Sequence, residues 1–288
     1  MRAAKHVAGL LGLMFTSEQA LAAYQMNLPP GVTSFSQGAY DIHTMVRWRC
    51  VVSGAIVFGA MIYSIINHRK SKGAVSAEFH DNTAIEIIWT VIPFLILIAM
   101  AIPATKVLLA MEDTSNSDMS IKVTGYQWKW HYDYLGEDIS FFSNISTPDA
   151  ANLSTNASVK KDDTYLLDVD NRLVIPEDTK VRLLFTSNDV IHAWWVQAFG
   201  VKKDAIPGFI NESWVNVPDP GVYRGKCAEL CGKNHGFMPV VVEAKSKEDY
   251  AAWVSGQKVA AAEAAVSYTH LTLPTSKPKC RSRWSPYH

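Results

Sequence analysis

The sequence predicts a protein of mixed class, in which a hairpin of two membrane-spanning helices is followed by an all-β sandwich. Two uncharged apolar runs, 50–66 and 87–105, are just long enough to cross the hydrocarbon core of a bilayer. From Ser120 onward the chain consists of short segments rich in β-branched and aromatic residues, broken by Gly, Pro, Asn and Asp. The 288 residues carry a net charge of zero, which gives no reason to expect a nucleic-acid partner.

The start of the chain is typical of a secretory signal peptide. Arg2 and Lys5 form a basic beginning, an apolar core follows over 7–15, and small residues suitable for cleavage come next. An apolar core of this length is too short to anchor the chain in a membrane. We therefore expect residues 1–22 to be removed and residues 23–44 to lie outside the cytoplasm.

The two spanning helices are expected over residues 45–67 and 84–109. Pro93 and Pro103 lie inside the second helix, where neighbouring groups in a membrane can satisfy the freed carbonyls. The loop between the helices, 68–83, contains the basic run NHRKSKG, which is typical of a cytoplasmic loop. Together with the signal peptide, this loop predicts that both ends of the mature chain lie outside the cytoplasm.

Residues 120–244 are expected to form one antiparallel sandwich or barrel, since about 125 residues suit a single domain. The candidate strands lie in IKVTGYQWKWHYDY, YLLDVDNRLVIP, KVRLLFTSND, AWWVQAFG, ESWVNVPDPGVYRGKC and GFMPVVVEA. Residues 245–266 then predict a helix that fades into an alanine-rich linker.

The loop CAELCGKNHGFM concentrates two thiols, an imidazole and a thioether. Outside the cytoplasm, a disulfide is the simplest interpretation of two nearby cysteines. The same groups are also the soft ligands that select copper over magnesium or calcium. Cys227 and Cys231 can bridge two copper ions, and His235 and Met238 can add one imidazole and one weaker ligand. Such a pair needs a second imidazole from elsewhere in the chain.

Two histidines of the β domain are candidates for that second imidazole, His131 and His192. His192 follows a strand and precedes two tryptophans in SNDVIHAWW, so its ring can face a loop that packs over the end of the sheet. A lone histidine usually has a structural role, but the missing ligand favours His192. His131 lies in the aromatic run YQWKWHYDY, in which we expect Trp130 and Tyr132 to pack inside the sandwich.

Five motifs make the chain resemble subunit II of the haem–copper cytochrome c oxidases. In chain order they are IEIIWTVIP, GYQWKW, VIHAW, KDAIPG and CAELCGKNHGFM, and the resemblance covers almost all of 23–245. It implies a membrane hairpin followed by a cupredoxin-like Greek-key sandwich that carries a dinuclear copper A centre. The copper ligands that it implies are His192, Cys227, Cys231, His235, Met238 and the backbone carbonyl of Glu229.

The resemblance also implies a place in respiration. The chain would be the electron-transfer subunit of a proton-pumping terminal oxidase in the inner membrane of a bacterium, with its copper domain on the periplasmic side. It would accept electrons from cytochrome c and pass them to haem a in subunit I, with subunit III as a further partner. We do not expect this chain alone to reduce oxygen.

Three further residues have roles implied by the resemblance. Trp128 would be the exposed ring that receives electrons from cytochrome c. The Glu229 carboxylate would bind a magnesium ion shared with subunit I, for which a hard oxygen ligand is suited. Glu86, in the first turn of the second helix on the cytoplasmic side, would be the mouth of a proton path.

The surface around Trp128 departs from the family pattern. Tyr126 stands where many relatives carry histidine, and Lys129 where many carry an aromatic residue. Acids near this run can attract a basic cytochrome or simply form a solvated rim. They are Asp133, Glu137, Asp138 and Asp189.

Two alternative functions stay open at this level. A membrane-anchored copper chaperone or thiol-redox protein also uses a C-x-x-x-C pair, on a thioredoxin-like domain. A scaffolding subunit would use Cys227 and Cys231 as a structural disulfide. The strand-rich pattern and the H-x-x-M that follows the second cysteine argue against the first alternative, and the full set of copper ligands argues against the second.

The end of the chain has a different character. Residues 267–288 show no helical or strand period, add a lone Cys280 and are strongly basic. The stretch YTHLTLPTS resembles a translated sequencing adapter. We expect this tail not to be native and the native gene to continue beyond residue 266. In bacterial relatives, an alanine-rich linker at this point often leads into a fused cytochrome c domain.

Overall fold

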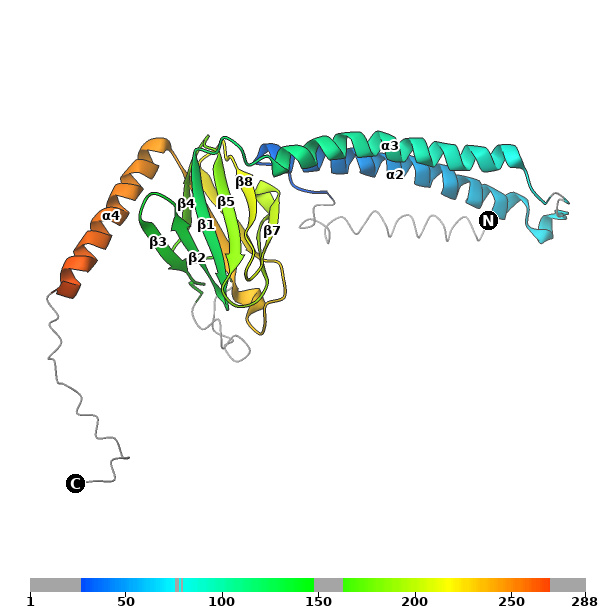
Figure 1. The fold of residues 1–288 in the computed structure, drawn as a ribbon. Coiled ribbons are helices and arrows are strands. Elements are labelled where there is room, and N and C mark those ends of the chain that lie inside the picture. The colour runs from blue at the N-terminus through cyan, green and yellow to red at the C-terminus, as the bar shows by residue number, and fades with distance from the viewer. Residues whose placement is uncertain (1–26, 76–77, 79, 148–162, 270–288) are drawn as a thin grey trace, which may run out of the picture.

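The structure is a computed structural model that describes residues 27–75, 78, 80–147 and 163–269 (Figure 1). The predicted signal peptide and the predicted tail from residue 270 onward lie outside the described residues. The described part has the predicted fold class, because a hairpin of two apolar helices precedes an all-β sandwich.

The hairpin consists of α2 (Ser34–Asn67) and α3 (Thr83–Glu112), with the short 3-10 helix η2 (Lys70–Lys72) in the connection. Both helices are long and apolar enough to cross a membrane, and no residue in the most apolar stretch of either is buried. A core helix of a soluble protein would be mostly buried, so the exposed apolar surface of this pair suits a lipid environment. Figure 1 shows the two helices running side by side away from the sandwich.

Helix α2 begins at Ser34, well before the predicted start at residue 45. A capping box sets this start: the Thr33 hydroxyl accepts from the Ser36 amide at 3.2 Å, and the Ser36 hydroxyl accepts from the Thr33 amide at 2.9 Å. The Thr33 hydroxyl also donates to the carbonyl of Phe199 in the sandwich at 2.7 Å. Since this first part of the helix is polar, hydropathy alone does not reveal it.

The sandwich has two five-stranded sheets. The first sheet has the strand order β3-β2-β1-β5-β8 and the second has the order β4-β10-β9-β6-β7. The strands are β1 (Met119–Tyr126), β2 (Lys129–Tyr134), β3 (Ile139–Ser143), β4 (Leu173–Pro176), β5 (Val181–Ser187), β6 (His192–Val196), β7 (Val201–Ala205), β8 (Asn211–Val215), β9 (Gly221–Cys227) and β10 (Pro239–Lys245).

The prediction of an entirely antiparallel sandwich is wrong for two strand pairs. Strand β1 runs parallel to β5, and β4 runs parallel to β10. Each parallel pair joins strands that are separated by other strands in the chain, so crossovers set the direction. Burial alternates along a strand in the same way whether its neighbour is parallel or antiparallel, as along Lys129–Tyr134. The sequence pattern therefore does not reveal the direction of pairing.

The two sheets enclose a core of large rings. Trp130, Tyr132, Phe185 and Trp194 are completely buried, which confirms the expected packing role of Trp130 and Tyr132. The side of the first sheet that faces away from this core carries His131, whose ring lies 4.7 Å from the Phe142 ring.

Trp214 of β8 fixes the membrane hairpin to the sandwich. Its ring lies 4.3 Å from that of Phe35 in α2, and its indole N–H donates to the carbonyl of Ala110 in α3 at 3.2 Å. An ion pair of 3.0 Å between Lys203 and Glu112 adds a second link to α3. The orientation of the β domain on the hairpin is therefore set by contacts to both helices.

The last helix, α4 (Lys247–Thr269), lies along the side of the sandwich opposite the hairpin, next to β3 and β4 (Figure 1). Trp253 packs against Tyr134 and Phe141, with ring centroids 5.4 Å and 6.3 Å away. Lys258 pairs with Glu137 at 2.6 Å. The helix starts where the sequence predicts it and continues to Thr269.

Candidate metal centre

Three chain segments meet at one end of the second sheet. His192 is the first residue of β6 and Cys227 is the last residue of β9, the strand that pairs with β6. The loop after Cys227 returns through the 3-10 helix η5 (His235–Phe237) to β10. The Cys227 amide donates to the carbonyl of Met238 at 3.0 Å, which closes this loop on itself.

The loop and the strand end bring thiols and imidazoles within a few ångströms of one another. The Sγ atoms of Cys227 and Cys231 are 3.9 Å apart. Nδ1 of His192 lies 3.9 Å from the Cys227 sulfur, and Nδ1 of His235 lies 3.6 Å from the Cys231 sulfur. The site thus combines two thiols and two imidazoles, which are ligands that suit copper or zinc.

The spacing of the two sulfurs bears on the disulfide alternative. A disulfide holds its sulfurs at about 2.05 Å, so Cys227 and Cys231 are free thiols at 3.9 Å. Metal–thiolate bonds are about 2.3 Å long for zinc and similar ions, and one ion can therefore contact both sulfurs. The ligand atoms of His192, Cys227 and Cys231 all lie within 4.8 Å of one another, and this group fits copper.

The site is almost dry. His192 is completely buried, the two cysteines are each 3% exposed, and Met238 is 1% exposed. His235 is half-buried and lies at the outer edge. Burial excludes competing water from the ligands and lets the surrounding sandwich fix their positions.

The backbone carbonyls of Met238 and Glu229 both contact Cys227. The Met238 carbonyl is tied to the Cys227 amide, so its buried side chain starts from the same end of the sheet. The Glu229 carbonyl accepts from the Cys227 thiol at 3.4 Å, while the Glu229 side chain is exposed. The carbonyl and the carboxylate of Glu229 are thus available to different partners.

The electrostatics favour one negative charge on the thiol pair. Burial raises the pKa of Cys227, but hydrogen bonds from His192 and from backbone groups outweigh burial and lower that pKa overall. Burial, followed by the charge on Cys227, raises the pKa of Cys231. The second thiol therefore needs a nearby cation to ionise, and a bound metal ion supplies one.

Asp189 accompanies the buried imidazole. Its Oδ1 lies 2.8 Å from Nε2 of His192, on the side of the ring away from Cys227. Burial alone would lower the pKa of His192, but the hydrogen bonds to Cys227 and Asp189 raise it overall. A carboxylate on the second ring nitrogen is a common way to orient a histidine ligand.

Trp128 lies beside the cluster, and Glu86 lies far from it in the fold. The Trp128 indole N–H donates to the carbonyl of Cys231 at 3.1 Å, and its ring is half-buried. Glu86 is in the first turn of α3, at the end of the membrane hairpin away from the sandwich, and is exposed (Figure 1). His131 does not reach the cluster.

Two residues with contacts to this cluster were not predicted as parts of the site. Gln127 donates through its side-chain amide to the Cys231 carbonyl at 2.9 Å. Asp189 was considered only as one of several surface acids. The signals in the sequence are weak: Gln127 directly precedes Trp128, and Asp189 stands three residues before His192.

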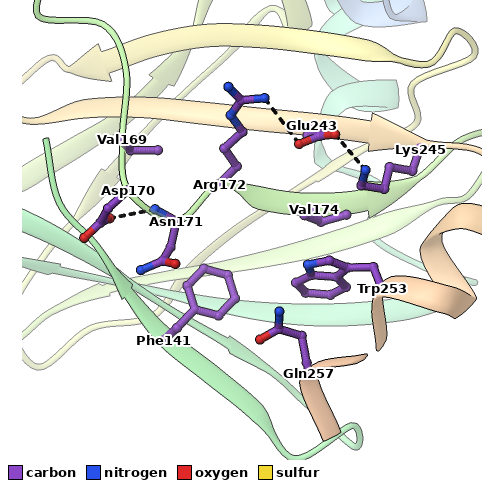
Figure 2. Close-up of a pocket in the computed structure, with 10 residues that line it drawn as sticks. All are labelled: Phe141, Val169, Asp170, Asn171, Arg172, Val174, Glu243, Lys245, Trp253 and Gln257. Atoms are coloured by element: carbon purple, nitrogen blue, oxygen red, sulfur yellow. Dashed lines mark hydrogen bonds and ion pairs between the residues drawn. The ribbon is translucent and has the colours of Figure 1, made fainter. Parts of the chain in front are cut away.

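A cavity of about 430 Å³ lies elsewhere, between β3, β4, β10 and α4. Figure 2 shows Phe141 and Trp253 on one side of it and Glu243 between Arg172 and Lys245. Glu243 pairs with Arg172 at 3.4 Å and with Lys245 at 2.7 Å. Because these charges pair with one another, we place the functional site at the thiol cluster.

Comparisons with known proteins match the chain to one family. The family described as cytochrome c oxidase subunit II, periplasmic domain, matches residues 119–245. The family described as cytochrome c oxidase subunit II, transmembrane domain, matches residues 22–107. Together the two matches cover the hairpin and the sandwich.

Curated relatives cover nearly the same span. The probable cytochrome c oxidase subunit 2 of Rickettsia bellii is 39% identical over 262 residues, which are 90% of this chain and 95% of the relative. The cytochrome c oxidase subunit 2 of Cereibacter sphaeroides is 34% identical, over 86% of this chain and 88% of the relative.

One similar solved structure is the periplasmic domain of subunit II of cytochrome oxidase from Bradyrhizobium japonicum. It is 38% identical, covers 50% of this chain and 96% of its own, and has a TM-score of 0.45.

Proposed function

The chain belongs to the cytochrome c oxidase subunit II family, and we propose that it is the subunit that receives electrons from cytochrome c and passes them to haem a in subunit I. It is a membrane protein and a subunit of a haem–copper oxidase. The β-sandwich does not match the thioredoxin-like domain that a copper chaperone of the C-x-x-x-C type would have.

The observation that carries the proposal is the row of four ligands, His192, Cys227, Cys231 and His235. Its two inner members are thiols 3.9 Å apart, and each thiol has an imidazole nitrogen within 3.9 Å. Two copper ions would be held by these two thiols and two imidazoles, with Met238 and the Glu229 carbonyl as further, weaker ligands. A copper pair supplies one-electron redox chemistry in which the charge is shared by both ions.

The protein's own contribution is rigidity. Cys227 and His192 start from paired strands, and the Cys227 and Ala228 amides are bonded to Met238 and Ala193 at 3.0 Å. Ligands held in this way move little when the charge of a bound ion changes. Small movement lowers the reorganisation that accompanies electron transfer, which suits a relay site where no substrate bond is made or broken.

We place the arrival of electrons at Trp128. Its ring is half-buried, and its indole N–H reaches the carbonyl of a proposed copper ligand. A donor such as cytochrome c that contacts the exposed edge of the ring would lie one side chain away from the centre. Tyr126 and Lys129 face Phe142 instead, with Lys129 4.1 Å above that ring, so they shape the neighbouring surface.

We assign Glu229 and Glu86 to the contacts with subunit I. The exposed Glu229 carboxylate can bind a magnesium ion whose other ligands come from the partner, because its carbonyl already faces the thiols. Glu86 is exposed at the N-terminal end of α3, where a proton path into subunit I would open. With the basic loop on the cytoplasmic side, the copper domain lies on the periplasmic side of a bacterial inner membrane. Subunit III would be a further neighbour.

The test is oxidation of cytochrome c by the assembled oxidase that carries Cys227→Ser. We expect this activity to be lost while the haem spectrum of subunit I is retained, since only the relay is removed. Cys50→Ser in α2 is the matched control, and it should keep full activity. Wild-type oxidation of cytochrome c by the Cys227→Ser oxidase would exclude the proposed function.

A further inference from the structure

The turn between β1 and β2 holds the loop that contains Cys231. The Gln127 side-chain amide and the Trp128 indole N–H both donate to the Cys231 carbonyl, at 2.9 Å and 3.1 Å. A carbonyl oxygen has two lone pairs, so it can accept both hydrogen bonds. This turn belongs to the first sheet, whereas the cysteine loop extends from the second sheet.

Gly232 provides the space for these two donors. Its φ of +120° is a conformation that favours glycine. A Cβ atom at this position would lie 3.1 Å from Cζ2 of Trp128 and 3.2 Å from Nε2 of Gln127. Any side chain at residue 232 would therefore push against the turn just where it binds the Cys231 carbonyl.

The same turn reaches His192 through Asp189. The Gln127 backbone amide donates to Oδ2 of Asp189 at 2.7 Å, and Oδ1 of Asp189 lies 2.8 Å from Nε2 of His192. The Val190 amide donates to Oδ1 at 2.6 Å. Both carboxylate oxygens are thus occupied by internal partners, and the side chain is only 28% exposed. This engagement distinguishes Asp189 from a solvated surface acid.

Strand β1 also packs directly on the imidazole. Gly125, two residues before Gln127, would place a Cβ atom only 2.7 Å from Cδ2 of His192. The end of β1 and the turn after it therefore fix the ring of His192 from one side. They fix the Cys231 carbonyl from another side.

We propose that Gln127 and Asp189 are positioning residues that couple the two ends of the copper centre to the turn that carries Trp128. The proposal rests on the copper site of the proposed function. Gln127 links the turn to the Cys231 loop by its side chain and to Asp189 by its backbone, and Asp189 links it to His192. The turn that carries Trp128 thus also sets the position of the His192 imidazole and that of the Cys231 backbone, on opposite sides of the site.

Three variants of the full-length chain in detergent test this coupling. Gln127→Met keeps the length of the side chain and removes its donor. Asp189→Asn keeps the shape of the side chain but has only one accepting oxygen, whereas the carboxylate of Asp189 accepts hydrogen bonds at both of its oxygens. Gln197→Met, at an exposed glutamine of the 3-10 helix η4 (Gln197–Phe199), is the matched control because no side-chain hydrogen bond is formed there in the described part of the chain.

The first measurement is amide hydrogen exchange on the metal-free chain. We expect faster exchange in the peptides that cover 125–131 and 228–236 for Gln127→Met and for Asp189→Asn, and no change for Gln197→Met. Strand β4, which pairs with the end of β10 away from Cys227, reports whether the fold is intact. Unchanged exchange in both peptides for both variants would overturn the proposal, whether or not the chain binds copper.

The second measurement is the loss of copper from the loaded chain to a chelator, together with its absorption and electron spin resonance spectra. Residues that orient a ligand typically change metal affinity by about 10- to 100-fold, so we expect copper loss at least about tenfold faster for Asp189→Asn, with altered spectra for both variants. Wild-type spectra and loss rates in both variants would overturn the proposal and leave the proposed function standing. A wild-type chain that binds no copper but shows the exchange effect would refute the proposed function and leave the coupling of the turn standing.

Discussion

The indole N–H of Trp128 donates a hydrogen bond of 3.1 Å to the carbonyl oxygen of Cys231. This bond joins the turn between β1 and β2 of the first sheet to the backbone of the loop that follows β9 of the second sheet. The ring is half-buried, so one edge stays accessible to another protein. The relationship places a partly exposed aromatic ring in direct contact with the backbone of the candidate metal centre.

Trp128→Phe should slow electron transfer from cytochrome c to the assembled oxidase. The shorter ring lacks the N–H donor, while Gln127 still holds the Cys231 carbonyl, so copper content should stay at the wild-type level. We expect a decrease in rate of at least about tenfold, which corresponds to about 1.4 kcal/mol of activation free energy. Stopped-flow reduction by cytochrome c, compared with reduction by a small inorganic reductant, measures this effect. An unaltered rate with cytochrome c would remove Trp128 from the pathway.

Much of the fold could be predicted because its signals are local. The uncharged run 87–105 predicts α3 to within a few residues, and the cluster of strand segments predicts a sandwich between Met119 and Lys245. The start of α2 was missed, because it depends on a capping box at Thr33 and on the burial of Phe35 against the sandwich. Hydropathy does not report either contact.

The metal ligands of the site could be predicted from the sequence, but the residues that hold those ligands in place could not. The pattern C-x-x-x-C-x-x-x-H-x-x-M is confined to one loop, and only one distant imidazole had to be found. The contact between Gln127 and Cys231 spans 104 positions in the chain, and that between Gln127 and Asp189 spans 62. The first contact depends on how the two sheets stack and the second on the pairing of β1 with β5, and the sequence of either segment alone does not encode these arrangements.

Glu229→Ala should weaken binding of manganese, used in place of magnesium, to the assembled oxidase. The copper spectrum should change little, since the contact of residue 229 with Cys227 is made by the backbone carbonyl. The measurement is the manganese electron spin resonance signal after growth on manganese. Glu248→Ala, at an exposed acid in α4, is the control. A full manganese signal in Glu229→Ala would limit Glu229 to its backbone role.

Glu86→Gln should slow proton uptake that accompanies haem reduction in the oxidase. The change removes an ionisable group from the first turn of α3 without altering its length, and it lies far from the thiols. Proton uptake is followed with a pH indicator, and Asp81→Asn just before the helix is the control. Normal uptake combined with reduced copper content would instead indicate misassembly.

Phe35→Ala should destabilise the junction between the hairpin and the sandwich. Phe35 is 3% exposed and packs on Trp214, and truncation of a buried phenylalanine typically costs about 3 kcal/mol. Thermal unfolding of the metal-free chain in detergent, followed by tryptophan fluorescence, measures the loss. Phe209→Ala, at a side chain that is 68% exposed, should have little effect. Equal unfolding temperatures for the two variants would contradict the packing described for Phe35.

The most direct test of the account is a metal count on the purified full-length chain after reduction and loading with copper, combined with its electron spin resonance spectrum. The free thiols of Cys227 and Cys231, 3.9 Å apart between two imidazoles, predict two copper ions per chain and a seven-line spectrum from one electron shared by both ions. Changing either cysteine to serine should abolish that spectrum. A Cys227–Cys231 disulfide that returns after reduction, with no copper bound, would contradict the central claim.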